Sequence, residues 1–523
     1  MLRLRSILLL STVISLAACG PGGVASPGEG VIVVPTPGTP APPPPPPPPP
    51  AGNGTPAAGC PQGTVDRGVI ATAFRNCEFS GRISDDYTVQ KLPGVVYSLA
   101  GPVNVGTDVG GDGSLAGGDA VTLTIQAGVT VFGSSGNDYL VVNRGSRINA
   151  VGSATQPIIF TARANVEGTA TDSTQGLWGG VILLGRAPIS DCNTAVAGGS
   201  AACQQVIEGT TGSFYGGNVA TDNSGTMRFV QIRYSGFAIA PGNELQGLTM
   251  GGVGSNTTID HIQIHNSSDD GIEIFGGRVN VKHIVISGAD DDGLDTDLGY
   301  RGTIQFVIGV QRDSQNGDSM IEADSNGNED ALPRQYTRVS NATFVQRSTV
   351  QGGNAILLRG GTDYALLNSV VTGPTACLDI DATGNTTIRP TDAAVQDVGP
   401  PVFRSVVLAC PTAFRDDGNI TVAEIQAIFG SGSNGNNSAF TPSLSSVFIN
   451  GANETGISVT DPTPFNNDQF QTANAAAPNR LETVAYIGAV RNASDNWFAG
   501  WTCNAGYVNF GNTSGNCTAV PTS

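Results

Sequence analysis

The sequence predicts an all-β chain that folds as a right-handed parallel β-helix, and three observations support this. The segments TIDHIQIHNSSDDGIEIFGG (258–277) and NVKHIVISGADDDGLDTDLG (280–299) align without a gap at a spacing of 22 residues. Apolar and polar residues alternate in short runs rich in Val, Ile and Leu, as in β-strands. Gly, Asn and Asp separate these runs, and the chain holds 71 glycines, which excludes a helical repeat. A fixed period of this length indicates a solenoid, and parallel crossover connections are nearly always right-handed.

The repeat also assigns the interior of this solenoid. A third copy begins at GTIQFVIG, and looser copies include TMRFVQIRYSG, SNATFVQ, ALLNSVVTG and FRSVVLACP. Twenty-two residues accommodate three short strands and three turns, and a β-sandwich, the alternative fold, would not require this register. The expected inward-facing side chains, with Ile262, Ile284 and Phe306 in one column, are Ile262, Ile264, Ile272, Ile284, Ile286, Leu294, Phe306 and Ile308.

The N-terminal residues 1–18 are typical of a secretory signal peptide. Arg3 and Arg5 precede the apolar run ILLLSTVISLAA, which is too short to span a bilayer as a helix. The run ends in LAAC, which resembles the lipobox of bacterial lipoproteins and implies that Cys19 carries lipid such as palmitate. The alternative is ordinary secretory cleavage beside a coincidental cysteine. Gly20 then implies sorting to the outer membrane of a Gram-negative bacterium, where we expect the protein at the cell surface.

Four further segments follow the signal peptide. Residues 19–59 hold the lipidated N-terminus and a disordered linker, whose proline run favours a stiff polyproline II rod. Residues 60–94 are expected to form a disulfide-bonded N-terminal cap, 95–460 the β-helix and 461–523 a C-terminal capping region. Thr421 and Glu424 form a capping box and predict a helix over 421–429. Trp497 and Trp501 mark the tail, 480–523, which is expected to cover the open end of the solenoid.

Charge and cysteine content restrict the partners and the compartment. The formal net charge of −18 argues against nucleic acid or an anionic membrane surface as a partner. Once Cys19 is set aside, eight cysteines remain in an oxidising compartment, and they fall as close neighbours. No CxxC pair occurs, so disulfides are favoured over a metal cluster. The expected pairs are Cys60 with Cys77, Cys192 with Cys203, Cys377 with Cys410, and Cys503 with Cys517.

The segment SGADDDGLDTDLG (287–299) contains the strongest candidate site. Alternation directs Asp295 and Asp297 outward, and the register places further carboxylates beside them, about 4.8 Å away on adjacent coils. The expected acidic strip comprises Glu273, Asp292, Asp295, Asp297, Glu322 and Asp324, with Glu273, Asp295 and Glu322 in one column. Three interpretations remain open: a solvated face covered by Arg301, Arg312 or Arg359; a Ca²⁺ site, since Ca²⁺ prefers carboxylate and carbonyl oxygens; or catalysis by paired carboxylates.

The catalytic interpretation rests on a partial resemblance. SSDDGIEI and DDDGLDTD resemble the Asp motifs of polygalacturonase-type β-helix hydrolases, which implies Asp270, Asp292, Asp295 and Asp297 as catalytic residues. That family also needs a Gly-His-Gly turn and an Arg-x-Lys motif, and this chain has neither. The histidines of the repeat, His261 and His283, should stack one coil apart with Gln305 below them. A hydrogen-bonded side-chain ladder is favoured there over a zinc site.

Longer motifs resemble a group of bacterial secreted and surface-lipoprotein β-helix proteins of uncharacterised function. These are GLWGGVILLGRAPI, GGVGSNTTIDHIQIHNSSDDGIEIFGGRVNVKHIV, DDDGLDTDLGYRGTIQF and YIGAVRNASDNWFAGW. The resemblance covers most of residues 100–505. It implies that the protein acts together with a TonB-dependent outer-membrane receptor. We therefore expect a non-enzymatic binding or scaffold protein that contacts such a receptor or a polysaccharide. The alternative is a polysaccharide lyase or glycoside hydrolase that uses the acidic strip.

Overall fold

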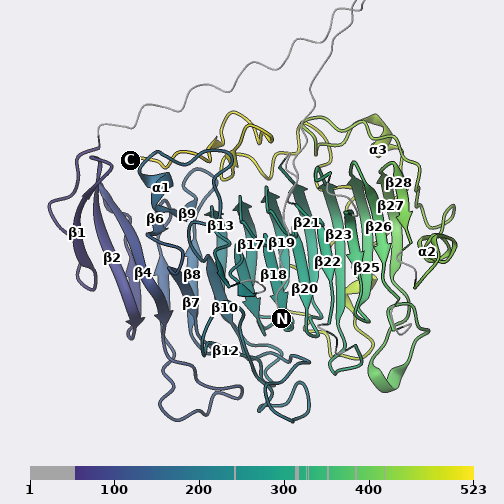
Figure 1. Ribbon diagram of the computed structural model, residues 1–523, viewed down its shortest axis with the longest axis horizontal. Coiled ribbons are helices and arrows are strands. Elements are labelled where there is room, and N and C mark those ends of the chain that lie inside the picture. Colours follow the sequence, from purple (N-terminus) through teal and green to yellow (C-terminus); the bar gives the residue numbers. More distant parts are fainter. Residues whose placement is uncertain are drawn as a thin grey trace, which may run out of the picture. The chain divides into compact units, whose positions relative to one another are not determined.

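The computed structural model describes residues 54–522, except 241–242, 313–316, 326, 328, 350–352, 383–385 and 417–418. The predicted signal peptide, Cys19 and most of the Pro-rich linker lie outside the described residues. Over residues 74–415 the chain winds mainly into stacked coils of short parallel strands (Figure 1). The predicted right-handed parallel β-helix is confirmed. Within the described part of the chain, no helix is long and apolar enough to cross a membrane.

The parallel ladders divide the coils into three faces, which we call sheets A, B and C. Seven long strands contribute their first half to sheet A and their second half to sheet B: β13 (Gly225–Arg233), β17 (Thr258–His265), β19 (Asn280–Ser287), β21 (Thr303–Val310), β23 (Tyr336–Val345), β25 (Asp363–Thr372) and β27 (Val402–Ala409). Upstream, sheet A also contains β3 (Tyr87–Val89), β5 (Thr122–Ile125) and β8 (Arg147–Val151). Sheet B also contains β2 (Phe74–Ile83), β4 (Val95–Val105), β6 (Thr130–Gly133) and β9 (Ile158–Ala162).

Sheet C carries the predicted acidic strip. Beyond the ends of β2 and β4 it consists of β7 (Tyr139–Val142), β10 (Val181–Leu184), β16 (Leu248–Gly251), β18 (Ile272–Phe275), β20 (Leu294–Asp297), β22 (Ile321–Ala323), β24 (Asn354–Leu358), β26 (Ala376–Ile380) and β28 (Thr412–Arg415). Outside the coils lie β1 (Val65–Ile70), β11 (Gln205–Val206), β12 (Phe214–Tyr215), β14 (Ala238–Ala240), β15 (Asn243–Glu244), β29 (Cys503–Asn504), β30 (Gly515–Asn516), α1 (Arg163–Val166), α2 (Val422–Phe429), α3 (Ala452–Thr455) and the 3₁₀ turns Ala393–Val395 and Thr463–Asn466.

Each long strand bends from sheet A to sheet B at one residue in the left-handed region. The φ angles are 56° at His261, 52° at His283 and 62° at Phe306, which is uncommon for residues other than glycine. The stack of His261 on His283 is confirmed, with ring centroids 4.3 Å apart. Phe306, rather than Gln305, follows in that column, 4.9 Å from the His283 ring.

The predicted interior is correct for the first two copies of the repeat and wrong for the third. Ile262 and Ile284 pair across β17 and β19 and lie in the core, but the partner of Ile284 on β21 is Val307. Ile308 pairs with Val285 and faces outward, under the C-terminal segment. The turn before β21 is one residue longer than the turn before β19, and a slip of one residue exchanges the two faces of a strand.

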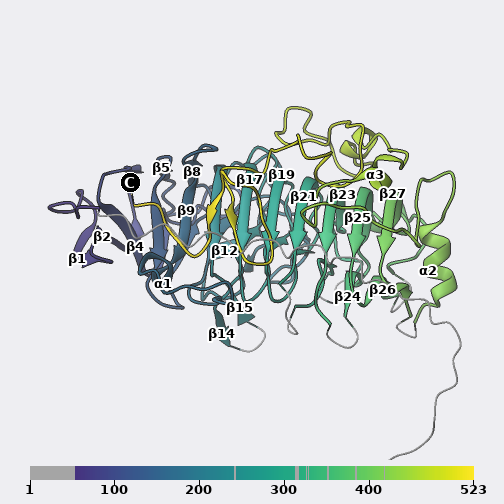
Figure 2. The same cartoon turned by 90° about the horizontal axis from the view of Figure 1, so that it is seen from above.

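The predicted helix is present, but the C-terminal segment lies elsewhere than predicted. The helix predicted over 421–429 is α2, whose N-terminus is closed by the Thr421–Glu424 capping box. It packs Ile425 and Phe429 onto the last coil, so α2 covers that end. Residues 480–522 instead lie along the side of the coils, and Figure 2 shows this yellow segment reaching back to the N-terminal coils.

Outward amides on successive coils hold this C-terminal segment. Gln263 donates to the carbonyl of Cys503 at 3.0 Å and accepts its N–H at 2.7 Å, and Gln305 does the same with Glu482 at 2.8 and 2.9 Å. Asn341 donates to the Tyr486 carbonyl at 2.8 Å. Each residue satisfies backbone groups that would otherwise be buried without partners. The four predicted disulfides, Cys60–Cys77, Cys192–Cys203, Cys377–Cys410 and Cys503–Cys517, are all present.

Candidate functional site

The acidic site begins with two turn residues that hold successive coils together. Asp270 accepts the backbone N–H of Asp292 at 2.9 Å, and Asp292 accepts the N–H of Ser319 on the next coil at 2.7 Å. The adjoining glycines are needed because the coils approach closely. A Cβ on Gly271 would lie 2.6 Å from the carbonyl oxygen of Gly293. Both aspartates are buried, so each has one oxygen committed to the fold before any ligand is considered.

The predicted column of carboxylates is present on sheet C. Glu273 pairs with Asp295, and Asp295 pairs with Glu322, on consecutive strands β18, β20 and β22. The interpretation of the strip as a solvated face does not fit its central residues, because Glu273 is only 6% exposed and Asp295 only 9%. Oxygen atoms of Asp270, Glu273 and Asp295 all lie within 4.8 Å of one another.

Four carboxylate oxygens of the strip are buried without a hydrogen-bond partner: Oε2 of Glu273, Oδ1 of Asp295, Oδ1 of Asp297 and Oε1 of Glu322. Only Oε1 of Glu322 has a positively charged group beside it, in its ion pair with Arg359, so the oxygens of Glu273, Asp295 and Asp297 have neither a hydrogen bond nor an ion pair. Buried polar atoms are usually paired, and an unpaired carboxylate oxygen costs more than a neutral group. A positively charged ligand would therefore stabilise the folded protein most if it bound beside these atoms.

Burial and mutual repulsion raise the pKa values of the buried carboxyls of the strip and of its nearest neighbours. Loss of hydration, followed by the nearby carboxylates, raises the pKa of Glu273 and Asp295 well above the usual range. The same causes raise the pKa of Asp297 to about 8 and that of Asp291, in the turn beside the strip, to about 6. Asp292 is raised too, first by burial and then by the adjoining Glu322 carboxyl. Such a set binds protons or a cation near neutral pH.

Arginine side chains neutralise only the carboxylates at the margins of the strip. Arg359 forms ion pairs with Glu322 at 2.6 Å and with Asp324 at 3.0 Å, and 44% of its side chain is exposed. Arg312 pairs with Asp290 in the neighbouring turn. Arg301, a third candidate for covering the strip, pairs instead with Asp468 of the C-terminal segment. The central residues Glu273 and Asp295 therefore gain little from the basic side chains proposed to cover them.

An inserted segment, 186–222, covers the upstream part of sheet C. Tyr215 and Ile207 pack with Phe275 and Leu298 in an apolar cluster beside the strip. The insertion also brings Glu208 close enough to raise the pKa values of Glu273 and Asp297. The sequence could not place Glu208 there because the insertion lies outside the 22-residue register. Asp269 was detectable, since it precedes Asp270 in the repeat, and its pKa is raised to about 8.

The donor set of the strip suits a hard cation. Every group in it is a carboxylate, and Ca²⁺ takes six to eight oxygens, whereas zinc prefers nitrogen and sulfur. Asp270, Glu273 and Asp295 form one candidate set, and Asp269, Asp270 and Asp291 form another beside it. The predicted residues Asp297, Glu322 and Asp324 extend this site toward solvent.

The histidine column has a different chemistry. One oxygen of Asp260 lies 2.8 Å from Nδ1 of His261 and 2.7 Å from Nδ1 of His283. Burial alone would raise the pKa of Asp260, but the hydrogen bonds from both imidazoles hold it below its usual range. Trp497 covers the His283 ring. This arrangement matches the predicted hydrogen-bonded ladder, with both Nδ1 atoms occupied by Asp260.

Residues 109–442 match the family model of the pectate-lyase-like β-helix domain. The chain belongs to this family. No curated protein and no solved structure matches the chain.

Proposed function

We propose that this pectate-lyase-like β-helix protein is a non-enzymatic binding protein that holds Ca²⁺ in its acidic strip and uses the ion to engage an acidic polysaccharide. The observation that carries the proposal is the set of buried, unpartnered oxygens on Glu273, Asp295 and Asp297. A divalent cation would pair with these oxygens and relieve the repulsion that raises their pKa values.

The outer margin of the strip supports an anionic ligand. Ca²⁺ accepts six to eight oxygens, so a few protein carboxylates leave positions for carboxylates of a sugar chain. Arg359 lies beside these positions, is partly exposed, and offers the planar donor geometry that binds carboxylates. The family description names pectate, an acidic polysaccharide, which favours uronate-containing chains over neutral ones.

Binding is favoured over hydrolysis because two proposed catalytic residues serve the fold. Asp270 and Asp292 each accept a backbone N–H from the following coil, and both are buried. A carboxylate that acts as nucleophile or general base must reach the substrate or an attacking water. Of the four proposed catalytic residues, this leaves Asp295 and Asp297 for the role of nucleophile or general base.

Calorimetric titration tests the binding proposal. Titration of the chain with CaCl₂ should give a dissociation constant of about 10⁻⁴ to 10⁻³ M, typical of extracellular modules. Oligogalacturonate should then bind in Ca²⁺ and not in chelator. Asp295→Asn should weaken Ca²⁺ binding, whereas Asp85→Asn, which removes an exposed carboxylate on an N-terminal coil, should not. Wild-type protein that takes up no Ca²⁺ would overturn the proposal.

The second candidate is a polysaccharide lyase or hydrolase that uses the same strip. The family match favours it, and so does the carboxyl of Asp297, whose pKa of about 8 suits proton transfer near neutral pH. Incubation with acidic and neutral polysaccharides, with detection of reducing or unsaturated ends, separates the candidates. Turnover by the wild type that Asp295→Asn abolishes would establish the enzyme.

We also propose that Cys19 is lipidated and anchors the protein in the outer membrane, with the Pro-rich linker as a spacer. Replacing Cys19 by Ala should release the protein from membranes and alter processing of the signal peptide; unchanged fractionation and processing would exclude the anchor. A TonB-dependent receptor remains the proposed membrane partner. Affinity capture from detergent-solubilised outer membranes should recover such a receptor with the wild-type chain.

A further inference from the structure

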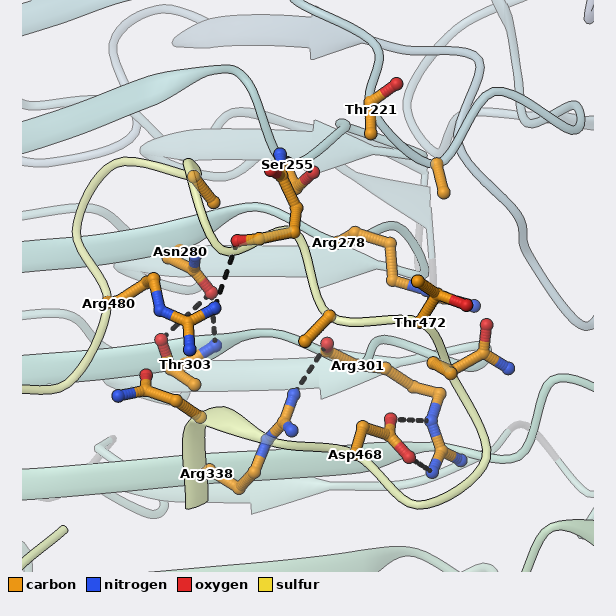
Figure 3. A pocket seen from close by; sticks show the side chains of 16 residues that line it. Thr221, Ser255, Arg278, Asn280, Arg301, Thr303, Arg338, Asp468, Thr472 and Arg480 are labelled. Carbon is orange, nitrogen blue, oxygen red and sulfur yellow. Dashed lines mark hydrogen bonds and ion pairs between the residues drawn. The ribbon is translucent and has the colours of Figure 1, made fainter. Parts of the chain in front are cut away.

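A second polar site lies away from the acidic strip, where the C-terminal segment crosses the start of sheet A. The pocket in Figure 3 is bounded on one side by residues at or just before β19, β21 and β23, and on the other by residues 466–480. It encloses about 80 Å³, enough for several waters or one small anion. Thr221, Thr472 and Ala473 at its margin are exposed, so the pocket opens to solvent.

Four arginines line this pocket, and Asp468 is the one acidic residue among its lining groups. Arg278 and Arg338 are almost fully buried, as is Arg301, while Arg480 is partly exposed. Asp468 is already committed to Arg301, with two hydrogen bonds of 2.6 and 2.7 Å that Figure 3 shows. The formal charge of the lining is therefore strongly positive in a chain whose net charge is −18.

Arg278 is the least satisfied of the four guanidinium groups. Its Nη1 donates to the carbonyls of Gly277 at 2.6 Å and Gly299 at 3.1 Å. Its Nε and Nη2 are buried and have no hydrogen-bond partner. Burial, followed by repulsion from Arg301, lowers the pKa of Arg278 to about 9. A guanidinium with two free donors on adjacent nitrogens is suited to bind two oxygens of one anion.

Two further arginines, Arg338 and Arg480, line the same pocket. Arg338 donates to backbone carbonyls, including that of Arg301 at 2.7 Å, and has no carboxylate in direct contact among the described residues. Arg480 donates through Nη1 to the carbonyl of Asn474 at 3.0 Å, on the opposite wall. Buried like charges at this density are unfavourable unless an anion compensates them.

We propose that this pocket is a binding site for a small oxyanion: sulfate, phosphate or the carboxylate of an acidic sugar. The anion accepts hydrogen bonds from Nε and Nη2 of Arg278 and neutralises Arg338 and Arg480. Because the walls belong to the coils and to segment 466–480, a bound anion also fastens that segment to the β-helix. This site is separate from the acidic strip and does not depend on Ca²⁺.

Thermal melts and calorimetry of the full chain in chelator test the proposal. Sodium sulfate, sodium phosphate and sodium galacturonate are compared with sodium chloride at matched ionic strength, so that general screening is subtracted. At least one of the three should bind and raise the melting temperature. Sulfate or phosphate alone identifies an inorganic or ester group as the ligand, and galacturonate alone identifies a sugar carboxylate.

Two variants and one control complete the test. Arg278→Gln should weaken binding of the active anion about tenfold or more, since charged hydrogen bonds are lost. Arg480→Gln lies at the margin, endangers folding less, and should weaken binding in the same direction. Arg404→Gln changes an exposed arginine on β27 and should leave binding unchanged. The proposal is overturned if all three anions act like chloride, or if folded Arg480→Gln and Arg278→Gln both keep wild-type affinity.

Discussion

Replacing Asp295 by Asn should stabilise the protein in chelator and should remove most of the stabilisation that Ca²⁺ gives the wild type. Oxygen atoms of Asp270, Glu273 and Asp295 lie within 4.8 Å of one another. At an effective dielectric constant of about 20, two full charges at that distance repel by about 3.5 kcal/mol. Partial protonation relieves some of this repulsion, so we expect Asp295→Asn to stabilise the chelated protein by about 1–3 kcal/mol.

In Ca²⁺ the same residue becomes a ligand. With a dissociation constant near 10⁻⁴ M, about 10 mM Ca²⁺ stabilises the wild type by about 2.7 kcal/mol. An unfolding entropy of about 2.1 cal/mol/K per residue, over roughly 470 residues, converts about 1 kcal/mol into about 1 °C of melting temperature. The wild type should therefore melt about 3 °C higher in CaCl₂ than in chelator, and Asp295→Asn should lose most of this increment.

Differential scanning calorimetry measures both effects in one experiment. NaCl at equal ionic strength controls for screening, and Asp85→Asn controls for the loss of one negative charge from an exposed position. If the wild type melts at the same temperature in CaCl₂ and in chelator, the strip does not hold Ca²⁺. If Asp295→Asn is less stable than the wild type in chelator, the carboxylates do not repel one another as argued.

Three further outcomes follow from the structure. In chelator, melting temperature should fall as pH rises from 5 to 8. The folded-state pKa values of Asp297 and Asp291, about 8 and about 6, lie above the unfolded value, so the folded state loses stability as these groups ionise; a rising profile would contradict this. Gln263→Leu should cost about 2–4 kcal/mol in urea unfolding and expose segment 480–522 to proteolysis, because two buried backbone groups of Cys503 lose their partner; unchanged proteolysis would contradict the lateral attachment. Ile284→Ala should cost about 2–5 kcal/mol by the same measurement, as for other core truncations, and a loss below 1 kcal/mol would remove Ile284 from the core.

The fold was predictable because the two best copies of the repeat share one length. Between β17 and β19 the register is 22 residues, so Ile262 and Ile284 were assigned correctly. The turn before β21 is one residue longer, and this shift misplaced Phe306 and Ile308. Sheet C was unaffected, because Glu273, Asp295 and Glu322 could be aligned from their own strands. An error in the predicted register therefore affects only the sheet that follows a turn of altered length.

Burial of the acidic strip and the arginine pocket depend on contacts between distant parts of the chain. Tyr215 and Glu208 approach the strip from an insertion that has no period. Asp468 meets Arg301 across 167 residues of sequence. The sequence does contain a local indication of the arginine pocket, since Arg278 and Arg301 occupy equivalent turns before β19 and β21. It does not show that residues 466–480 close over these arginines.

The two proposed sites arise from the same property of a solenoid. A coil register places equivalent residues directly above one another, so a charge that recurs in the repeat becomes a stack of like charges. Such a stack is tolerated when solvent screens it, yet both stacks here are largely buried, Glu273 and Asp295 on sheet C and Arg278 and Arg301 at the start of sheet A. Each lies beside a non-repeating segment, 186–222 or 466–480, that removes solvent. Burial of like charge is unfavourable in both places, so each stack gains most from a ligand of opposite charge: a divalent cation for the carboxylates and an oxyanion for the guanidinium groups.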